Sequence, residues 1–144
     1  MRPKYETTTD LRNEFNVASE YAASFGCSVV KMPMQYRIDF AIVDASQNVL
    51  AFIEVKRRLN NMNAYSTCIL SLSKVMAAIE MRKTTKKNCY FLVAWNDATG
   101  IVELTDKYDV KIGGRKDRND WQDIEPVVHI PVSDFEVIEK CTTQ

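Results

Sequence analysis

The sequence predicts an α/β domain in which helices flank a mixed central sheet. A helical segment comes first, and three segments rich in valine, isoleucine and phenylalanine follow it. A second helical segment and a further apolar, strand-like segment come next. The order α-β-β-β-α-β-β indicates an antiparallel meander of three strands and one parallel strand that returns through the second helix.

One domain is expected for the whole chain. With 144 residues, 46% of them hydrophobic and 26% charged, the composition is typical of a single globular unit that buries about two-thirds of its unfolded surface. It excludes a disordered tail and a multidomain protein. We expect the core to cover about residues 8–105 and a loop-rich extension to cover about residues 106–144.

Capping and turn residues mark where the first helix and the three strands of the meander begin and end. Threonines and an aspartate at residues 7–10 can cap a helix that runs to about Phe25, where Gly26 ends it. A polar turn is expected at residues 44–48, before the third strand. The three strands are predicted over residues 27–32, 36–43 and 49–56.

The second half of the chain is predicted from the same signals. A polar loop at residues 60–63 leads to a helix over about residues 67–83. Two strands follow, over residues 89–95 and 101–104, on either side of a turn at 96–100. Further on, we expect an exposed loop over 111–120, a short strand over 126–130 and a last helical turn capped by Ser133.

The charge is balanced overall but uneven along the chain. Lys plus Arg is 19 and Asp plus Glu is 19, which by itself argues against binding to nucleic acid through bulk positive charge. Residues 1–56 carry 6 basic and 7 acidic side chains, residues 57–96 carry 7 and 1, and residues 97–144 carry 6 and 11. The middle segment therefore predicts one basic surface on a neutral protein.

Cysteines and hydropathy restrict the location of the protein. The four cysteines include no C-x-x-C pair and the chain has a single histidine, which argues against a structural zinc site. No run approaches the roughly 18 apolar residues of a membrane span, and the N-terminus lacks the apolar region of a signal peptide. We expect a soluble, cytoplasmic protein with reduced cysteines and no membrane partner.

Carboxylates occur in two predicted strands that are otherwise apolar. Glu54 and Lys56 point to the same face of the third strand, although such a pair could also be an exposed ion pair at a strand end. Asp39 lies within the second strand, where a buried carboxylate needs a partner or a cation. If the two strands pair across the intervening turn, residues whose numbers sum to about 92 face each other. Asp39 then lies opposite Ile53 or Glu54.

Glu14 is the third candidate carboxylate. At about 100° per residue it lies within the apolar stripe of the first helix, whereas Glu20 lies on the opposite side. Glu14 is therefore expected to point at the sheet, and the alternative is a glutamate held by a salt bridge at the rim of the core. Three converging carboxylates beside Lys56 would suit Mg²⁺, and Lys56 could position a water or neutralise charge on a phosphoryl group. This arrangement predicts phosphodiester hydrolysis.

These residues resemble the motif of the PD-(D/E)XK nuclease superfamily. The resemblance rests on Asp39 in the second strand, on the E-x-K element Glu54-Val55-Lys56 15 residues later, and on Glu14 in the preceding helix. It implies the restriction-endonuclease-like αβββαβ core over about residues 8–95. It also implies Asp39, Glu54, Glu14 and the backbone carbonyl of Val55 as ligands of Mg²⁺ or Mn²⁺, and Lys56 as the catalytic lysine.

Lys74 and other basic residues are the candidate DNA contacts. Lys74 lies nearly opposite the arc that the second helix is expected to bury, which includes Val75 and Met76. Proteins similar to this one often carry a polar residue on this helix that reaches the active site or the phosphate backbone, and a solvated lysine is the alternative. Phosphate contacts of this kind are independent of sequence. The candidates are Arg57, Arg58, Lys74, Arg82, Lys83, Arg115, Lys116 and Arg118.

The resulting prediction is a Mg²⁺-dependent DNA endonuclease that acts as a homodimer on branched DNA, as in the Holliday-junction resolvases that share this small fold. Two alternatives remain: a catalytically inactive nuclease-fold subunit for nucleic-acid binding or assembly, and an interaction module whose charged residues form ordinary ion pairs. His129 is expected to be a strand residue rather than a catalytic base. Trp95 and Trp121 are expected to pack in the core rather than to stack on bases.

Overall fold

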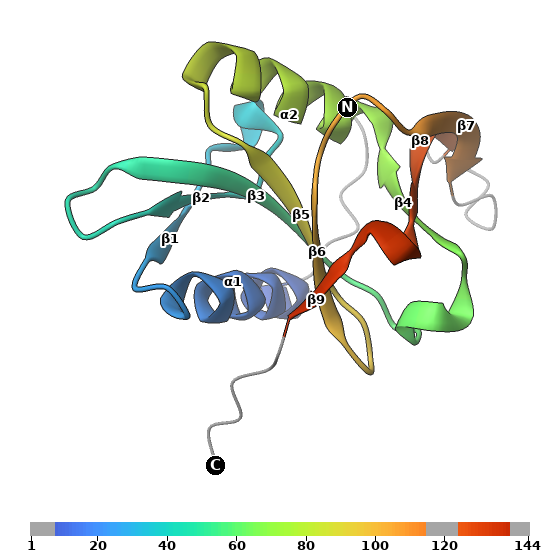
Figure 1. The fold of residues 1–144 in the computed structure, drawn as a ribbon, viewed down its shortest axis with the longest axis horizontal. Helices are drawn as coiled ribbons and strands as arrows, with labels where there is room; N and C mark the ends of the chain where they lie inside the picture. The colour runs from blue at the N-terminus through green and yellow to red at the C-terminus, as the bar shows by residue number, and fades with distance from the viewer. Residues whose placement is uncertain (1–7, 115–123, 139–144) are drawn as a thin grey trace.

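Two β-sheets and two α-helices make up the part of the chain that the computed structural model describes, residues 8–114 and 124–138. The strands of the larger sheet are β1 (Ser28–Lys31), β2 (Phe40–Val43), β3 (Val49–Arg57), β5 (Cys89–Ala94), β6 (Thr99–Glu103) and β9 (Glu136–Ile138). The smaller sheet contains β4 (Thr67–Ser71), β7 (Asp109–Gly114) and β8 (Ile124–Pro131). Their orders are β1-β2-β3-β5-β6-β9 and β4-β8-β7 (Figure 1).

The two helices are α1 (Thr8–Ala23) and α2 (Leu72–Thr85), and they cover opposite faces of the larger sheet (Figure 1). Ala18 of α1 packs in one core with Ile53, while Val75 of α2 packs in the other with Phe52. Because side chains alternate along a strand, Glu54 shares the α2 face with Phe52. Within the described residues, neither helix is long and apolar enough to cross a membrane.

The predicted meander and parallel crossover are confirmed. β1, β2 and β3 pair antiparallel in sequence, and β5 lies parallel to β3. The fold is therefore a mixed α/β sheet with helices on both faces, as the sequence predicts. Cys27, Cys68 and Cys89 are free thiols, and the latter two are buried in the core on the α2 side.

The second helix begins at Leu72, later than predicted, because Thr67–Ser71 forms strand β4. Burial alternates along this strand: Cys68 and Leu70 are buried, whereas Ile69 between them is 38% exposed. This is the period of a strand. β4 pairs with β8, some sixty positions away in sequence, so no neighbouring strand indicates it.

The expectation of a loop-rich extension over residues 106–144 is wrong for the described residues. β9 pairs with β6 and completes an edge of the larger sheet, and β7 (Asp109–Gly114) includes residues 111–114 of the expected loop. The strand predicted over 126–130 is part of β8. The helical turn expected at Ser133 is the 3₁₀ turn η4 (Val132–Asp134).

The second strand is also shorter than predicted. Residues Met34–Tyr36 form the 3₁₀ turn η1, and Arg37 after it is in the left-handed region with φ 61°. β2 consequently begins at Phe40. Asp39 lies at the entrance to the strand rather than inside it.

Gly100 is packed so closely that a methyl group would not fit without movement. A Cβ at this position would lie 3.0 Å from Cζ3 of Trp95 and 3.2 Å from Cβ of Phe135. We expect Gly100→Ala to lower the free energy of unfolding by about 1–3 kcal/mol, because overpacking forces core side chains off their rotamers. Urea denaturation measures this change. An unaltered midpoint would mean that the two rings move aside at no cost.

Candidate active site

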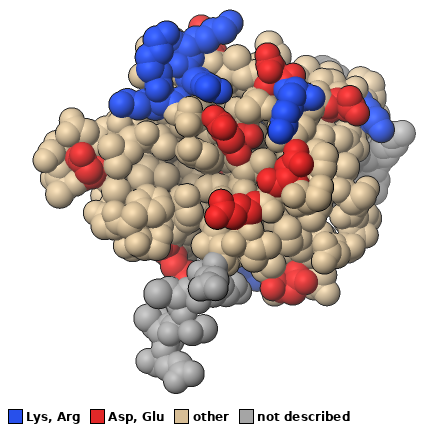
Figure 2. Space-filling model, in the orientation of Figure 1, with Lys and Arg blue, Asp and Glu red and all other residues tan. Residues whose placement is uncertain are grey.

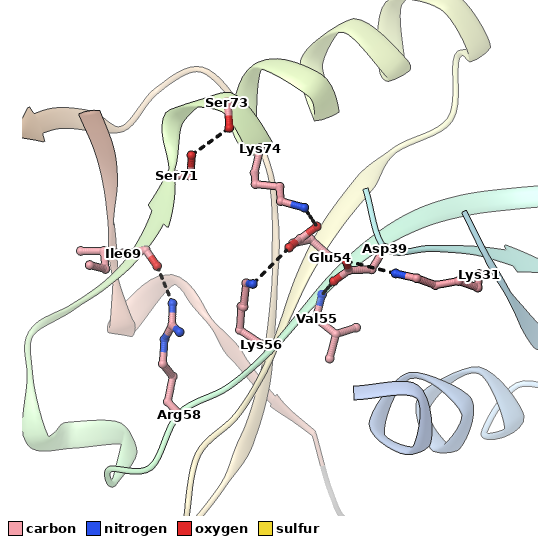
Figure 3. Close-up of polar contacts among 10 residues, drawn as sticks. All are labelled: Lys31, Asp39, Glu54, Val55, Lys56, Arg58, Ile69, Ser71, Ser73 and Lys74. Atoms are coloured by element: carbon pink, nitrogen blue, oxygen red, sulfur yellow. Dashed lines mark hydrogen bonds and ion pairs between the residues drawn. The ribbon is translucent and has the colours of Figure 1, made fainter. Parts of the chain in front are cut away.

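The larger sheet opens where β2 and β3 separate. The pair nearest the opening is Phe40 with Ile53. Beyond it, the Val55 N–H donates to the carboxylate of Asp39, with 3.0 Å between the nitrogen and Oδ2 (Figure 3). The N–H and C=O of a strand residue point to the same side. The Val55 carbonyl therefore faces the same opening as the Asp39 carboxylate.

Glu54 is a fully buried carboxylate, with 0% exposure. Nζ of Lys74 lies 3.3 Å from its Oε1, and Nζ of Lys56 lies 3.9 Å from its Oε2 (Figure 3). The Lys74 contact lies at the long limit of the roughly 2.7–3.2 Å of an N–H···O hydrogen bond, and the Lys56 contact lies clearly beyond it. Among the described residues, neither oxygen accepts a short hydrogen bond. The two lysines therefore form ion pairs that leave the carboxylate under-coordinated.

Burial raises the pKa of Glu54 to about 8, and the nearby Asp39 carboxylate raises this pKa as well. The positive charges of Lys74 and Lys56 act in the opposite direction but do not compensate. The ionised form of a buried carboxylate with a raised pKa is stabilised by any additional cation. Two carboxylates and a backbone carbonyl are oxygen donors of the kind that Mg²⁺ or Mn²⁺ prefers, so the residues present fit a hard divalent ion.

The structure agrees with the interpretation in which Lys74 reaches the candidate active site, but the helical phase predicted for Lys74 is wrong. Its side chain faces the sheet and reaches Glu54, whereas the predicted helical phase placed it opposite the buried arc. Val75 is buried as expected, but Met76 is 60% exposed. Val75 and Ala78, rather than Val75 and Met76, are the buried residues of α2, so its buried side is shifted toward Lys74.

Asp39, Glu54, Lys56 and Lys74 form a charged cluster. Lys31 also belongs to this cluster, although the sequence interpretation missed it. Its Nζ lies 3.6 Å from Oδ1 of Asp39 and 5.0 Å from the centre of the Phe40 ring. The antiparallel pairing of Lys31 with Phe40 places it there. A lysine at the end of the first apolar strand, taken with the antiparallel register that places it beside the start of the second, is the signal that could have identified it.

Glu14 is buried in α1 and Glu20 is exposed, so the predicted helical phase is confirmed. However, α1 covers the sheet face of Ile53, whereas Glu54 lies on the face of α2. Within residues 8–114 and 124–138, no three acidic, histidine or cysteine side chains form a group that could hold a metal. The structure thus brings Asp39 and Glu54 together, and the role of Glu14 as a further ligand stays a prediction.

The predicted DNA contacts are dispersed around this cluster. Arg57 lines a cavity of about 280 Å³ with Glu20 and Tyr21, so it lies on the α1 side of the sheet. Arg58, the next residue, lies on the opposite face of the sheet from Arg57. Its guanidinium donates to the carbonyl of Ile69, with 3.0 Å between nitrogen and oxygen.

A second basic group lies at the end of α2. Figure 2 shows basic side chains gathered over this end of the helix, whose last turn contains Arg82 and Lys83. Arg82 also forms an ion pair with Glu103, at 3.5 Å. Three further candidates, Arg115, Lys116 and Arg118, lie outside the described residues.

The histidine and tryptophan predictions agree with the structure where it describes them. His129 is a residue of β8, and its Nδ1 lies 3.0 Å from the hydroxyl of Thr67. Trp95 is 5% exposed and packs edge-on against Phe135, with 5.1 Å between ring centres. Trp121 lies outside the described residues.

Comparisons with known proteins identify a family and a fold. No curated protein matches the sequence. Among solved structures, the fold is similar to that of Hjc, a Holliday junction resolvase from Archaeoglobus fulgidus, with a TM-score of 0.55 and 14% sequence identity over 91% of this chain and 89% of that chain. The sequence also matches, over residues 1–138, the family described as "Phage putative PDDEXK endonuclease". The match extends well beyond the motif, so the chain belongs to this family of phage PDDEXK endonucleases and has the PD-(D/E)XK nuclease fold.

Proposed function

We propose that the protein is a metal-dependent DNA endonuclease that uses Mg²⁺, for which Mn²⁺ can substitute. The observation that supports this most strongly is Glu54, a fully buried carboxylate whose oxygens accept no short hydrogen bond from the described residues. Burying such a group is costly, and strongly perturbed carboxylates are concentrated at functional sites. Asp39, Glu54 and the Val55 carbonyl would hold the ion. Glu14 remains a candidate ligand from α1.

Each residue of the cluster has a distinct proposed role in hydrolysis. When bound, the ion would polarise the phosphoryl group and lower the pKa of water. Lys56, beside Oε2 of Glu54, is placed to orient the attacking water and to stabilise negative charge that develops on the phosphoryl oxygens. Lys74, at Oε1, fixes the orientation of the Glu54 carboxylate and favours its ionised form.

Branched DNA is the proposed substrate, and a homodimer the proposed active form. The fold is similar to that of a Holliday junction resolvase, and the family is one of endonucleases. A dimer with two-fold symmetry would present two copies of the site to the two strands of a junction. Phosphate contacts are proposed for the basic residues predicted from the sequence, of which Arg57 and Arg58 directly follow Lys56 along the chain.

Cleavage of matched DNA substrates tests this proposal. We expect the purified protein to cut a four-way junction in Mg²⁺ or Mn²⁺, to cut linear and single-stranded DNA of the same sequence more slowly, and to cut nothing in EDTA. Asp39→Ala should be inactive, since it removes a proposed ligand. Activity that survives in this variant would indicate a contaminating nuclease.

Two other outcomes would change the assignment. Equal cleavage of every substrate would retain the nuclease and overturn the preference for branched DNA. If no substrate is cut and calorimetry detects no binding of Mg²⁺, the protein would instead be a nuclease-fold subunit that binds nucleic acid or assembles with other proteins.

A further inference from the structure

A cavity of about 330 Å³ opens just beyond the catalytic strand. It lies between the segment that follows β3 and the smaller sheet, and its lining includes Arg58, Tyr65 and His129. The N–H of Arg58 donates to the carbonyl of Ala94, which continues the pairing of β3 with β5. Side chains therefore continue to alternate, and Arg58 lies on the same side as Glu54 and Lys56 (Figure 3).

The chemistry of this cavity is that of a small ligand site. Its size lies at the lower end of the roughly 300–1,000 Å³ that is typical of ligand pockets. Most of its wall is apolar, with Met62, Cys68 and Val132 among the lining residues. A few polar groups interrupt this wall. Such a combination accepts a flat, largely apolar molecule and orients it through a small number of polar contacts.

Three of the lining side chains have a planar face or a polar edge. Tyr65 is 68% exposed, so its ring is accessible to a ligand. Arg58 uses one guanidinium nitrogen for the carbonyl of Ile69, and guanidinium planes stack on flat rings. The Thr67 hydroxyl lies at Nδ1 of His129, so Nε2 is the ring nitrogen that we expect to meet a ligand. Nucleobases are recognised by this pair of contacts, stacking on the face and hydrogen bonding at the edge.

We propose that this cavity binds an unpaired nucleobase of the DNA strand that is cut. The inference rests on the proposed nuclease function and adds a second contact to it. Four residues of extended chain separate Glu54 from Arg58, a distance of about 13 Å at roughly 3.3 Å per residue. Stacked DNA advances about 3.4 Å per nucleotide along one strand, so the bound base lies within about four nucleotides of the cleaved phosphate. Releasing a base costs least where its pairing is already disturbed, and a branch point is such a place.

A scan with abasic sites tests the proposal through binding alone. Four-way junctions, each lacking one base within four nucleotides of the branch point, are titrated with the protein in EDTA and followed by fluorescence anisotropy. For the wild type, we expect one or two abasic positions to weaken binding about tenfold, the size of a stacking contact. Tyr65→Ala should weaken binding of the intact junction by a similar factor. In Tyr65→Ala, removing the base at those same positions should then cause no additional loss of binding affinity.

Two control variants separate stacking from general surface effects. Tyr65→Phe keeps the ring and should bind as the wild type does. Leu59→Ala truncates a side chain that is 79% exposed on the same segment but does not line the cavity, and it should also leave binding unchanged. The proposal is wrong if no abasic position weakens binding selectively, or if Tyr65→Ala shows the same abasic penalties as the wild type.

The experiment also distinguishes failure of the base site from failure of the nuclease assignment. If the protein cleaves the junction but the effects of Tyr65→Ala and of base removal are additive at every position, the nuclease assignment stands and the base site is wrong. Coupling in EDTA by a protein that cleaves nothing would retain the base site and overturn catalysis. Absence of any DNA binding would overturn both.

Discussion

Lys56→Ala is expected to slow phosphodiester cleavage by about 10²- to 10³-fold in single-turnover assays, the usual loss when one group that stabilises transition-state charge is removed. Lys56 lies 3.9 Å from Oε2 of Glu54, and its side chain is 25% exposed, so its ammonium group is accessible from solvent. Substrate affinity should change far less than the rate constant, because the proposed contact strengthens only as charge develops on the phosphoryl oxygens.

Two further variants show whether the loss is specific to this lysine. Lys56→Met retains most of the aliphatic chain and should be as inactive as the alanine variant, which excludes lost packing as the cause. Lys31→Ala removes a lysine that is 55% exposed and ion-paired with Asp39, and should slow cleavage much less. If Lys31→Ala and Lys56→Ala caused equal losses, the lysines would contribute only general positive charge.

The part of the site that depends on local pattern could be predicted from the sequence. Alternation along β3 places Glu54 and Lys56 on one face, and the hairpin register brings Asp39 beside them. Both signals lie within twenty residues of chain. Helical phase correctly predicts that Glu14 is buried, but it cannot tell which face of the sheet the helix covers.

Long-range pairing is the part that could not be predicted. β4 consists of five residues that pair with β8, and the sequence interpretation assigned them to the helix. β9 likewise pairs with β6, more than thirty positions earlier in the sequence. Short strands without a neighbouring partner carry no local signal stronger than that of a loop or a helix end. The cavity beside Arg58, which β4 and β8 help to line, was therefore not visible in the sequence.

The stability of the metal-free protein is expected to fall as the pH rises from about 4.5 to about 8, because of Glu54. The pKa of this carboxyl is about 8 in the folded protein against an ordinary value of 4.5. Between these values the folded state binds more protons than the unfolded state, so the free energy of unfolding decreases with rising pH. The penalty is absent below the lower pKa and complete above the higher one. Its size is on the order of 3–5 kcal/mol.

Glu54→Gln isolates this contribution, because it keeps the shape of the side chain and removes the ionisation. In EDTA, we expect the variant and the wild type to have similar free energies of unfolding at pH 5, and the variant to be more stable at pH 9. Glu80→Gln, at an exposed position of α2, is the matched control and should show no such divergence. Urea denaturation at pH 5, 7 and 9 measures all three proteins. A constant difference between Glu54→Gln and the wild type would contradict the assignment.

Mg²⁺ should reverse this order of stability at pH 9. An ion that binds the folded state alone stabilises it in proportion to the logarithm of its concentration above the dissociation constant. In the wild type, ionised Glu54 is a ligand, so added Mg²⁺ should raise the urea midpoint, and more so at pH 9 than at pH 6 because no proton must be displaced. In Glu54→Gln the carboxylate is absent and the midpoint should not respond. The residue that destabilises the metal-free protein is thus expected to be the one that stabilises the metal-bound form.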